Sequence, residues 1–171
     1  MQGIPKTYKF EKCHDVIEFF NIMKNNNAEL INYLTSFHKL EFSSGEMLLI
    51  YKNDILIGYL CIAPFNYIIS TFTQNLQIYQ HWKSIGKYDD NSFKYSSNKI
   101  NSYLQIFYDV IKQLNSNSYD ILDIALLEII KEHRSFNTVK VVFNYIKQYC
   151  IDNDFDFAWC SAKNESAARL Y

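Results

Sequence analysis

Apolar residues recur along the chain in two patterns, one typical of helices and one typical of strands. Apolar residues three and four positions apart predict a first helix from His14 onward, and residues 28–40 (AELINYLTSFHKL) predict a second. Residues 46–62 (EMLLIYKNDILIGYLCI) hold two apolar runs around a polar KND segment, which is typical of a β-hairpin with a tight turn. A short alternating stretch at 7–12 predicts one more strand before the first helix.

The second half of the chain predicts a strand–helix–strand unit. Residues 119–130 are a continuous apolar run with polar residues at its bounds, as in a strand that is buried on both faces. An amphipathic stripe at 138–152 predicts a helix, and 154–162 (DFDFAWCSA) predict a strand parallel to and beside the first. A final helix is predicted to begin at Asn164.

The region between these two halves has the least regular pattern. Residues 101–114 predict an amphipathic helix. Residues 65–100 show no clean period, so we expect partial helix near 71–83 and loop beyond it. The order of elements predicts a mixed α/β fold in one domain over 1–171, with a central mixed sheet flanked by helices and a helical insertion at about 65–114, between the third and fourth strands.

Composition excludes several classes of protein. Hydrophobic residues make up 49% of the chain, enough for a sizeable core, and a formal net charge of −1 gives no basic footprint for nucleic acid. The sequence has no apolar run long enough to span a membrane and no signal-peptide core at its start, so we expect no membrane partner. Four scattered cysteines favour a reduced, cytoplasmic setting, and four histidines without ligand spacing predict no metal site.

The last eight residues, NESAARLY, carry the most specific motif. A buried strand followed by Asn164, Ala167, Leu170 and Tyr171 in this spacing resembles the last conserved segment of the GNAT superfamily of N-acetyltransferases. The predicted hairpin with Gly58 after its turn, and the predicted unit from 119 to 152, resemble the earlier elements of that fold. The same residues would also suit a helix that Asn164 caps and that packs its apolar side chains inward.

The resemblance implies a CoA site in the loop before the predicted 138–152 helix. In the family, a Gln/Arg-x-x-Gly-x-Gly/Ala loop holds the CoA pyrophosphate on backbone N–H groups at the positive end of the helix dipole. Asn137 replaces the first glycine and is therefore expected to adopt positive φ, whereas the branched Val139 crowds the second small position. Alone, the segment would be an ordinary strand-to-helix loop. The matching residues are Arg134, Ser135, Phe136, Asn137, Thr138 and Val139.

The resemblance also implies acetyl transfer from acetyl-CoA, as co-substrate, to an amine. That reaction needs a base, an oxyanion donor and an acid. Family members place the oxyanion donor on the fourth strand, here near Leu127 to Ile129, and Tyr171 matches their general acid. Asn164, at the start of the same motif, is expected beside the cofactor.

Asp123 and Glu128 are the acids inside the 119–130 run, so they are the candidate bases. Strict strand alternation places them on opposite faces of the sheet. Asp123 could instead lie at a solvated strand end or bond the hairpin. Glu128 could face the substrate or pair with a lysine.

The family fold continues with two further strands beyond the motif, whereas this sequence ends at Tyr171. A shortened chain, a homodimer that covers the open sheet edge, or residues 65–114 filling that space would each account for the ending. A GNAT-like fold that serves as a non-catalytic interaction or regulatory module is the alternative to an enzyme. The sequence leaves the identity of the acceptor amine open.

Overall fold

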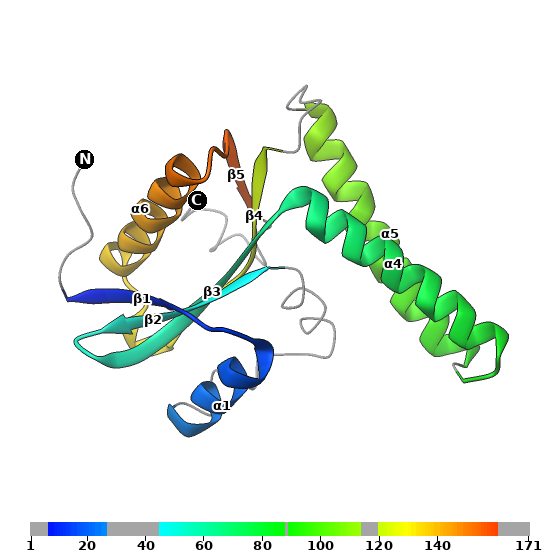
Figure 1. Cartoon of the computed structure of the whole chain (residues 1–171), viewed down its shortest axis with the longest axis horizontal. Helices are drawn as coiled ribbons and strands as arrows, with labels where there is room; N and C mark the ends of the chain where they lie inside the picture. The colour runs from blue at the N-terminus through cyan, green and yellow to red at the C-terminus, as the bar shows by residue number, and fades with distance from the viewer. Residues whose placement is uncertain (1–6, 27–44, 88, 114–119, 161–171) are drawn as a thin grey trace. The chain divides into compact units, whose positions relative to one another are not determined.

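The computed structural model describes four stretches of the chain: 7–26, 45–87, 89–113 and 120–160 (Figure 1). They belong to two compact units. One unit takes its residues from Met1–Ala63 and Asp120–Tyr171, and the other from Pro64–Tyr119. The first contains a five-stranded mixed sheet in the order β1-β2-β3-β4-β5, and the second contains two helices. The predicted mixed α/β class, with a helical insertion between the third and fourth strands, is confirmed.

The first three strands are antiparallel neighbours. β1 (Tyr8–Lys12) pairs with β2 (Glu46–Lys52), which pairs with β3 (Ile55–Pro64). Asn53 and Asp54 join β2 to β3 with φ of 50° and 64°, the backbone that a two-residue hairpin turn of the right twist requires. The register shifts between Ile50 and Tyr51, which leaves one extra residue on β3 as a bulge. The predicted hairpin and the predicted strand at 7–12 are therefore confirmed.

The other half of the sheet is a parallel crossover. β4 (Ile121–Ile129) leads through a short 3₁₀ turn, Lys131–His133, into α6 (Phe136–Asp152) and then β5 (Phe157–Cys160). β5 pairs with β4 in parallel, from Ile121 opposite Phe157 to Ile124 opposite Cys160. The predicted strand–helix–strand unit is confirmed with bounds close to those expected.

Both faces of the sheet are covered within the first unit (Figure 1). On one face, Val142 and Ile146 of α6 pack against buried side chains such as Ile50 and Leu60. On the other, α1 (Val16–Asn26) contributes the fully buried Phe19 and Met23. α1 begins in a capping arrangement: Asp15 Oδ1 accepts the Glu18 N–H at 2.8 Å, and the Glu18 carboxylate accepts the His14 N–H at 2.6 Å. The predicted helix after His14 is confirmed.

The second unit is a pair of helices, α4 (Phe65–Ser84) and α5 (Asp90–Gln113). Phe65 and Phe72 of α4 pack on Phe107 of α5, with ring centroids 4.7 and 6.0 Å apart. The helix predicted at 101–114 is confirmed as the second part of α5.

The loop predicted beyond residue 83 is wrong, because α5 already begins at Asp90, and α4 begins before residue 71. A buried polar residue interrupts the apolar stripe of α5. Ser97, only 8% exposed, lies between Phe93 and Ile100 at the spacing of one helix face. Its hydroxyl donates to the Phe93 carbonyl at 2.7 Å, so it can be buried without breaking the helix. The predicted helices at 28–40 and from Asn164 lie outside the described residues. None of the described helices is long and apolar enough to cross a membrane.

Candidate functional site at the connection from β4 to α6

The loop that the resemblance points to joins the carboxyl end of β4 to the start of α6. After the 3₁₀ turn, Arg134 (φ −70°, ψ 105°) and Ser135 (φ −144°, ψ 155°) are extended, and Ser135 is the N-cap of α6. The loop residues Arg134 to Asn137 are exposed, whereas Thr138 is fully buried. The six predicted loop residues therefore lie at the exposed start of α6, where the buried Thr138 packs against the interior.

Side-chain hydroxyls cap this first turn. Ser135 Oγ accepts the Thr138 N–H at 3.2 Å, and the Ser135 carbonyl accepts the Val139 N–H at 3.0 Å. The N–H groups of Phe136 and Asn137 have no hydrogen-bond partner among the residues that the structure describes. An α-helix always begins with such donors, and they give its first turn positive character. Two backbone donors are thus available for an anion at this position.

Asn137 does not have the backbone predicted for it. Among the described residues other than glycine, positive φ occurs at Asn53, Asp54 and Asp154. Asn137 is instead the second residue of α6. The turn into the helix is made by the extended Ser135, whose side chain caps the helix, so that no left-handed residue is required at 137.

Arg134 is held by the end of β4. Its Nε donates to the Ile129 carbonyl at 2.7 Å, and its Nη2 donates to Glu128 Oε1 at 2.6 Å. The Glu128 side chain is 15% exposed, whereas that of Arg134 is 50% exposed. Glu128 therefore has an arginine partner, not the lysine considered from sequence. A charge-assisted pair of this kind is shorter and stronger than a neutral hydrogen bond, so it fixes the Arg134 side chain against the end of β4.

Asp123 lies inside the sheet. It is 3% exposed and stands opposite Trp159 in the β4–β5 register, so it does not occupy a solvated strand end. Cys160, which stands opposite Ile124 in the same register, has a pKa above its ordinary range because of burial first and the charge of Asp123 second. Cys160 is thus a neutral thiol at physiological pH, as a core residue should be.

The apolar alternation of β4 shifts by one residue in the middle of the strand. The α1 face receives Leu126 and Ile130. The α6 face receives Leu122, Ile124, Leu127 and Ile129. Asp123 lies between Leu122 and Ile124, and Glu128 lies between Leu127 and Ile129. Because neighbouring residues of a strand face opposite sides, both acids face α1. The prediction of opposite faces assumed one unbroken alternation, which β4 does not have.

The segment predicted to supply the oxyanion donor lies in the second half of β4. Leu127 is half-buried and Ile129 is buried. The described pairing with β5 ends at Ile124, so this segment follows it. β3 approaches here as well, because the Ile130 N–H donates to the Ile57 carbonyl at 2.8 Å. Tyr171 and Asn164 lie outside the described residues, and their roles stay predictions.

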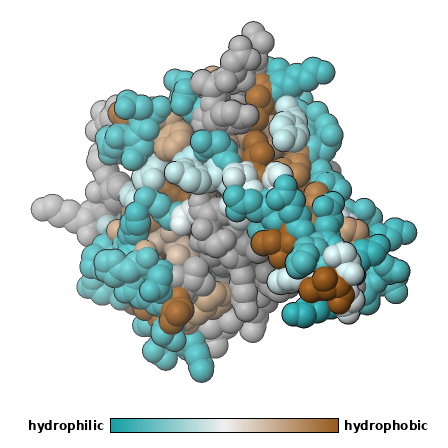
Figure 2. Space-filling model, turned by 45° about the vertical axis from the view of Figure 1, so that its right-hand side comes forward, coloured by the Kyte–Doolittle hydropathy of each residue, from teal (hydrophilic) through white to brown (hydrophobic). Residues whose placement is uncertain are grey.

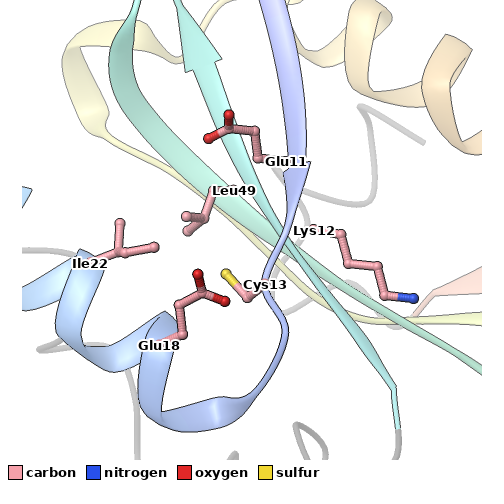
Figure 3. Close-up of a pocket in the computed structure, with 6 residues that line it drawn as sticks. All are labelled: Glu11, Lys12, Cys13, Glu18, Ile22 and Leu49. Atoms are coloured by element: carbon pink, nitrogen blue, oxygen red, sulfur yellow. The ribbon is translucent and has the colours of Figure 1, made fainter.

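A separate pocket of about 280 Å³ lies where β1, β2 and α1 meet (Figure 3). In Figure 3 the thiol of Cys13 lies beside the Glu18 carboxylate, while Lys12 points away. Burial, followed by the charges of Glu18, Glu11 and Asp15, raises the pKa of Cys13 to about 11. Cys13 is therefore a poor nucleophile. Sequence reasoning missed this pocket because its acids come from different elements. Its lining residues are Glu11, Lys12, Cys13, Glu18, Ile22 and Leu49.

No group of three or more His, Cys, Asp or Glu side chains among the described residues is arranged to hold a metal ion. Comparison of the chain with protein-family models, curated proteins and solved structures found no match.

Proposed function

We propose that this protein is an acyl-CoA-dependent N-acyltransferase that binds acetyl-CoA over the start of α6 and transfers the acetyl group to an amine. The observation that carries the proposal is the β4–α6–β5 unit, whose helix begins in an exposed turn just beyond the carboxyl end of a strand in a parallel pair. Ligands of open α/β sheets characteristically bind outside the carboxyl ends of parallel strands. The resemblance of the NESAARLY motif to the GNAT superfamily supplies the reaction.

The cofactor side of the proposal rests on backbone donors. The N–H groups of Phe136 and Asn137 would receive the CoA pyrophosphate, because they carry the positive end of the helix dipole. Arg134 lies beside them, and its remaining N–H groups can approach a phosphate while Glu128 holds the guanidinium. The absence of glycine from this loop therefore does not remove its donors.

Asp123 is the better candidate base of the two acids. Asp123 is buried in the sheet at 3% exposure, whereas Glu128 would have to give up its ion pair with Arg134 to accept a proton. In the proposed reaction the base takes a proton from the ammonium group, and the amine nitrogen attacks the thioester carbonyl carbon. A backbone N–H near Leu127 to Ile129 stabilises the oxyanion. The carbon–sulfur bond then breaks, Tyr171 protonates the leaving thiolate, and the Tyr171 phenolate takes the second proton from the amine nitrogen, which leaves a neutral amide.

We further propose a cytoplasmic location and an amine acceptor, with a homodimer as one arrangement that would cover the sheet edge. All four cysteines are free thiols, as expected in a reducing compartment. The test of the proposed function is a calorimetric titration of the protein with acetyl-CoA, followed by release of free CoA thiol in the presence of a panel of amines. Saturable binding and amine-dependent thiol release support an acyltransferase. Absence of binding overturns the proposal.

One observation favours a non-catalytic interaction module as the second candidate. Large apolar side chains of α4 and α5 are exposed, among them Trp82 (42%) and Tyr95 (71%). Figure 2 shows hydrophobic residues at the surface of the molecule with hydrophilic ones between them. Acetyl-CoA binding without any thiol release, together with self-association in sedimentation experiments, would favour this second function.

A further inference from the structure

Three hydroxyl groups form a chain from β1 to the first turn of α6. Tyr8 Oη lies 3.1 Å from Thr138 Oγ1, and Thr138 Oγ1 lies 2.9 Å from Ser135 Oγ. Tyr8 is 7% exposed and Thr138 is fully buried, whereas Ser135 is exposed. The chain therefore runs from the interior to the surface at the N-cap of α6, and it joins residues 130 positions apart.

Burial sets the direction of the protons in this chain. If Tyr8 donates to Thr138 and Thr138 donates to Ser135, the only proton left over belongs to the exposed Ser135 hydroxyl. In the opposite direction the leftover proton belongs to the Tyr8 phenol, and no other hydrogen bond of that hydroxyl occurs among the described residues. A buried donor without an acceptor costs free energy, while an exposed one can bond water. The first direction is therefore favoured.

Ser135 Oγ is an acceptor twice in this arrangement, from the Thr138 N–H and from the Thr138 hydroxyl. Its own proton must then point away from the helix. The adjacent outward-facing donors are the N–H groups of Phe136 and Asn137, the first two residues of α6.

We infer that Tyr8 and Thr138 are positioning residues that turn the Ser135 hydroxyl into a side-chain donor for the CoA pyrophosphate, an inference that rests on the proposed function. Ser135 then adds a third donor to the two backbone N–H groups of the turn. This third donor offsets the side chains that stand where the family has glycine.

The first test replaces Tyr8 with Phe, which removes the hydroxyl and keeps the buried ring. Acetyl-CoA should bind Tyr8→Phe about two- to tenfold more weakly than the wild-type protein, the net effect of one hydrogen bond. The matched control is Tyr145→Phe, which removes a phenol hydroxyl from α6, where the Tyr145 ring stacks on Phe10 of β1 at 4.1 Å. Tyr145→Phe should bind like wild type, and urea unfolding confirms that both variants are folded.

The second test asks whether Tyr8 acts through Ser135. Ser135→Gly retains an accepted N-cap residue but has no hydroxyl, and Ser135→Thr restores one. Tyr8→Phe should have no further effect on acetyl-CoA affinity in the Ser135→Gly background, and Ser135→Thr should bind nearly as tightly as wild type. Additive losses from Tyr8→Phe and Ser135→Gly would show a general structural effect and would overturn the inference.

The two proposals fail in different ways. A wild-type protein that does not bind acetyl-CoA overturns the proposed function and the inference with it. A wild-type protein that binds acetyl-CoA, together with a Tyr8→Phe variant of equal affinity, overturns the inference alone.

Discussion

Gly58 of β3 packs against the backbone of Glu128 on β4. A Cβ atom placed on Gly58 would overlap the Glu128 carbonyl oxygen and lie 3.1 Å from the Ile129 Cα. Both contacts are with backbone, which cannot swing aside as a flexible side chain can. This close approach fixes β3 against the end of β4, where the connection to α6 begins.

Gly58→Ala should therefore lower the free energy of unfolding by about 1–3 kcal/mol, the usual cost of overpacking a well-packed core. Urea unfolding measures the change. Gly86→Ala is the contrasting variant, because the described residues other than its chain neighbours place no atom within 4 Å of the added Cβ, but φ is +70°. Its expected cost is about 1 kcal/mol, from the left-handed backbone alone. A smaller loss for Gly58→Ala than for Gly86→Ala would contradict the close packing of β3 on β4.

Two aspartates have left-handed backbone, and replacing either with glycine should raise the stability of the protein. Asp54 in the hairpin turn has φ 64°, and Asp154 after α6 has φ 57°. Glycine adopts this backbone without steric cost, so Asp54→Gly and Asp154→Gly should each raise the free energy of unfolding by up to about 1 kcal/mol. The control is Asp109→Gly inside α5, which should lower it by about 1 kcal/mol. Destabilisation by both turn variants would show that these positions are not left-handed.

The Cys13 thiol should resist alkylation and titrate late. Its pKa in the folded protein is about 11 against an ordinary 9.0, so the protonated thiol is favoured by folding. This contribution to stability is fully present below pH 9 and is lost as the pH rises towards 11. Iodoacetamide labelling with peptide mass analysis should show slow reaction at pH 8 in the native protein and fast reaction in urea.

Stability measurements give an independent check of the same group. The difference in the free energy of unfolding between wild type and Cys13→Ala should stay constant up to pH 9. Above pH 9 the wild type should lose stability relative to Cys13→Ala. A native Cys13 that reacts at pH 8 as fast as the unfolded chain would mean that its thiol is accessible and easily ionised.

The pair between Arg134 and Glu128 should couple more strongly than an exposed ion pair. A double-mutant cycle with Arg134→Ala and Glu128→Ala is expected to give about 1 kcal/mol of coupling in the free energy of unfolding, because the carboxylate is largely buried. The control cycle uses Lys12 and Glu46, whose side chains are 59% and 33% exposed and whose coupling should be at most about 0.5 kcal/mol. Equal coupling energies in the two cycles would contradict the claim that burial of Glu128 strengthens its pair with Arg134.

Much of the sheet could be predicted because its patterning is strong. The apolar runs on both sides of KND made a hairpin the simplest reading, and the buried run at 119–130 followed by an amphipathic stripe specified a parallel crossover. The first turns of α5 were missed because Ser97 occupies a core position. Its local hydrogen bond satisfies the hydroxyl, and hydropathy alone cannot show this.

Site detail was predicted less well than the fold. The connection between β4 and α6 lies where it was predicted, but Asn137 was given the backbone that matching to glycine suggested. Ser135 directly before an apolar stripe is itself an N-cap signal and would have predicted the helix start. The shift in β4 and the contact of Tyr8 with Thr138 depend on long-range packing, so neither could be predicted from local patterns.

The most direct test of the central claim compares two identical substitutions at equivalent helix positions. Asn137 is the second residue of α6 and Asn91 the second residue of α5, so either change to Asp adds one negative charge to a first helical turn. Both charges should be tolerated or slightly stabilising, because they complement the helix dipole. By calorimetry, wild type and Asn91→Asp should bind acetyl-CoA alike, while Asn137→Asp should bind it at least about tenfold more weakly through repulsion of the pyrophosphate. Equal affinity of the two variants, or no binding by the wild-type protein, would contradict a CoA site at the start of α6.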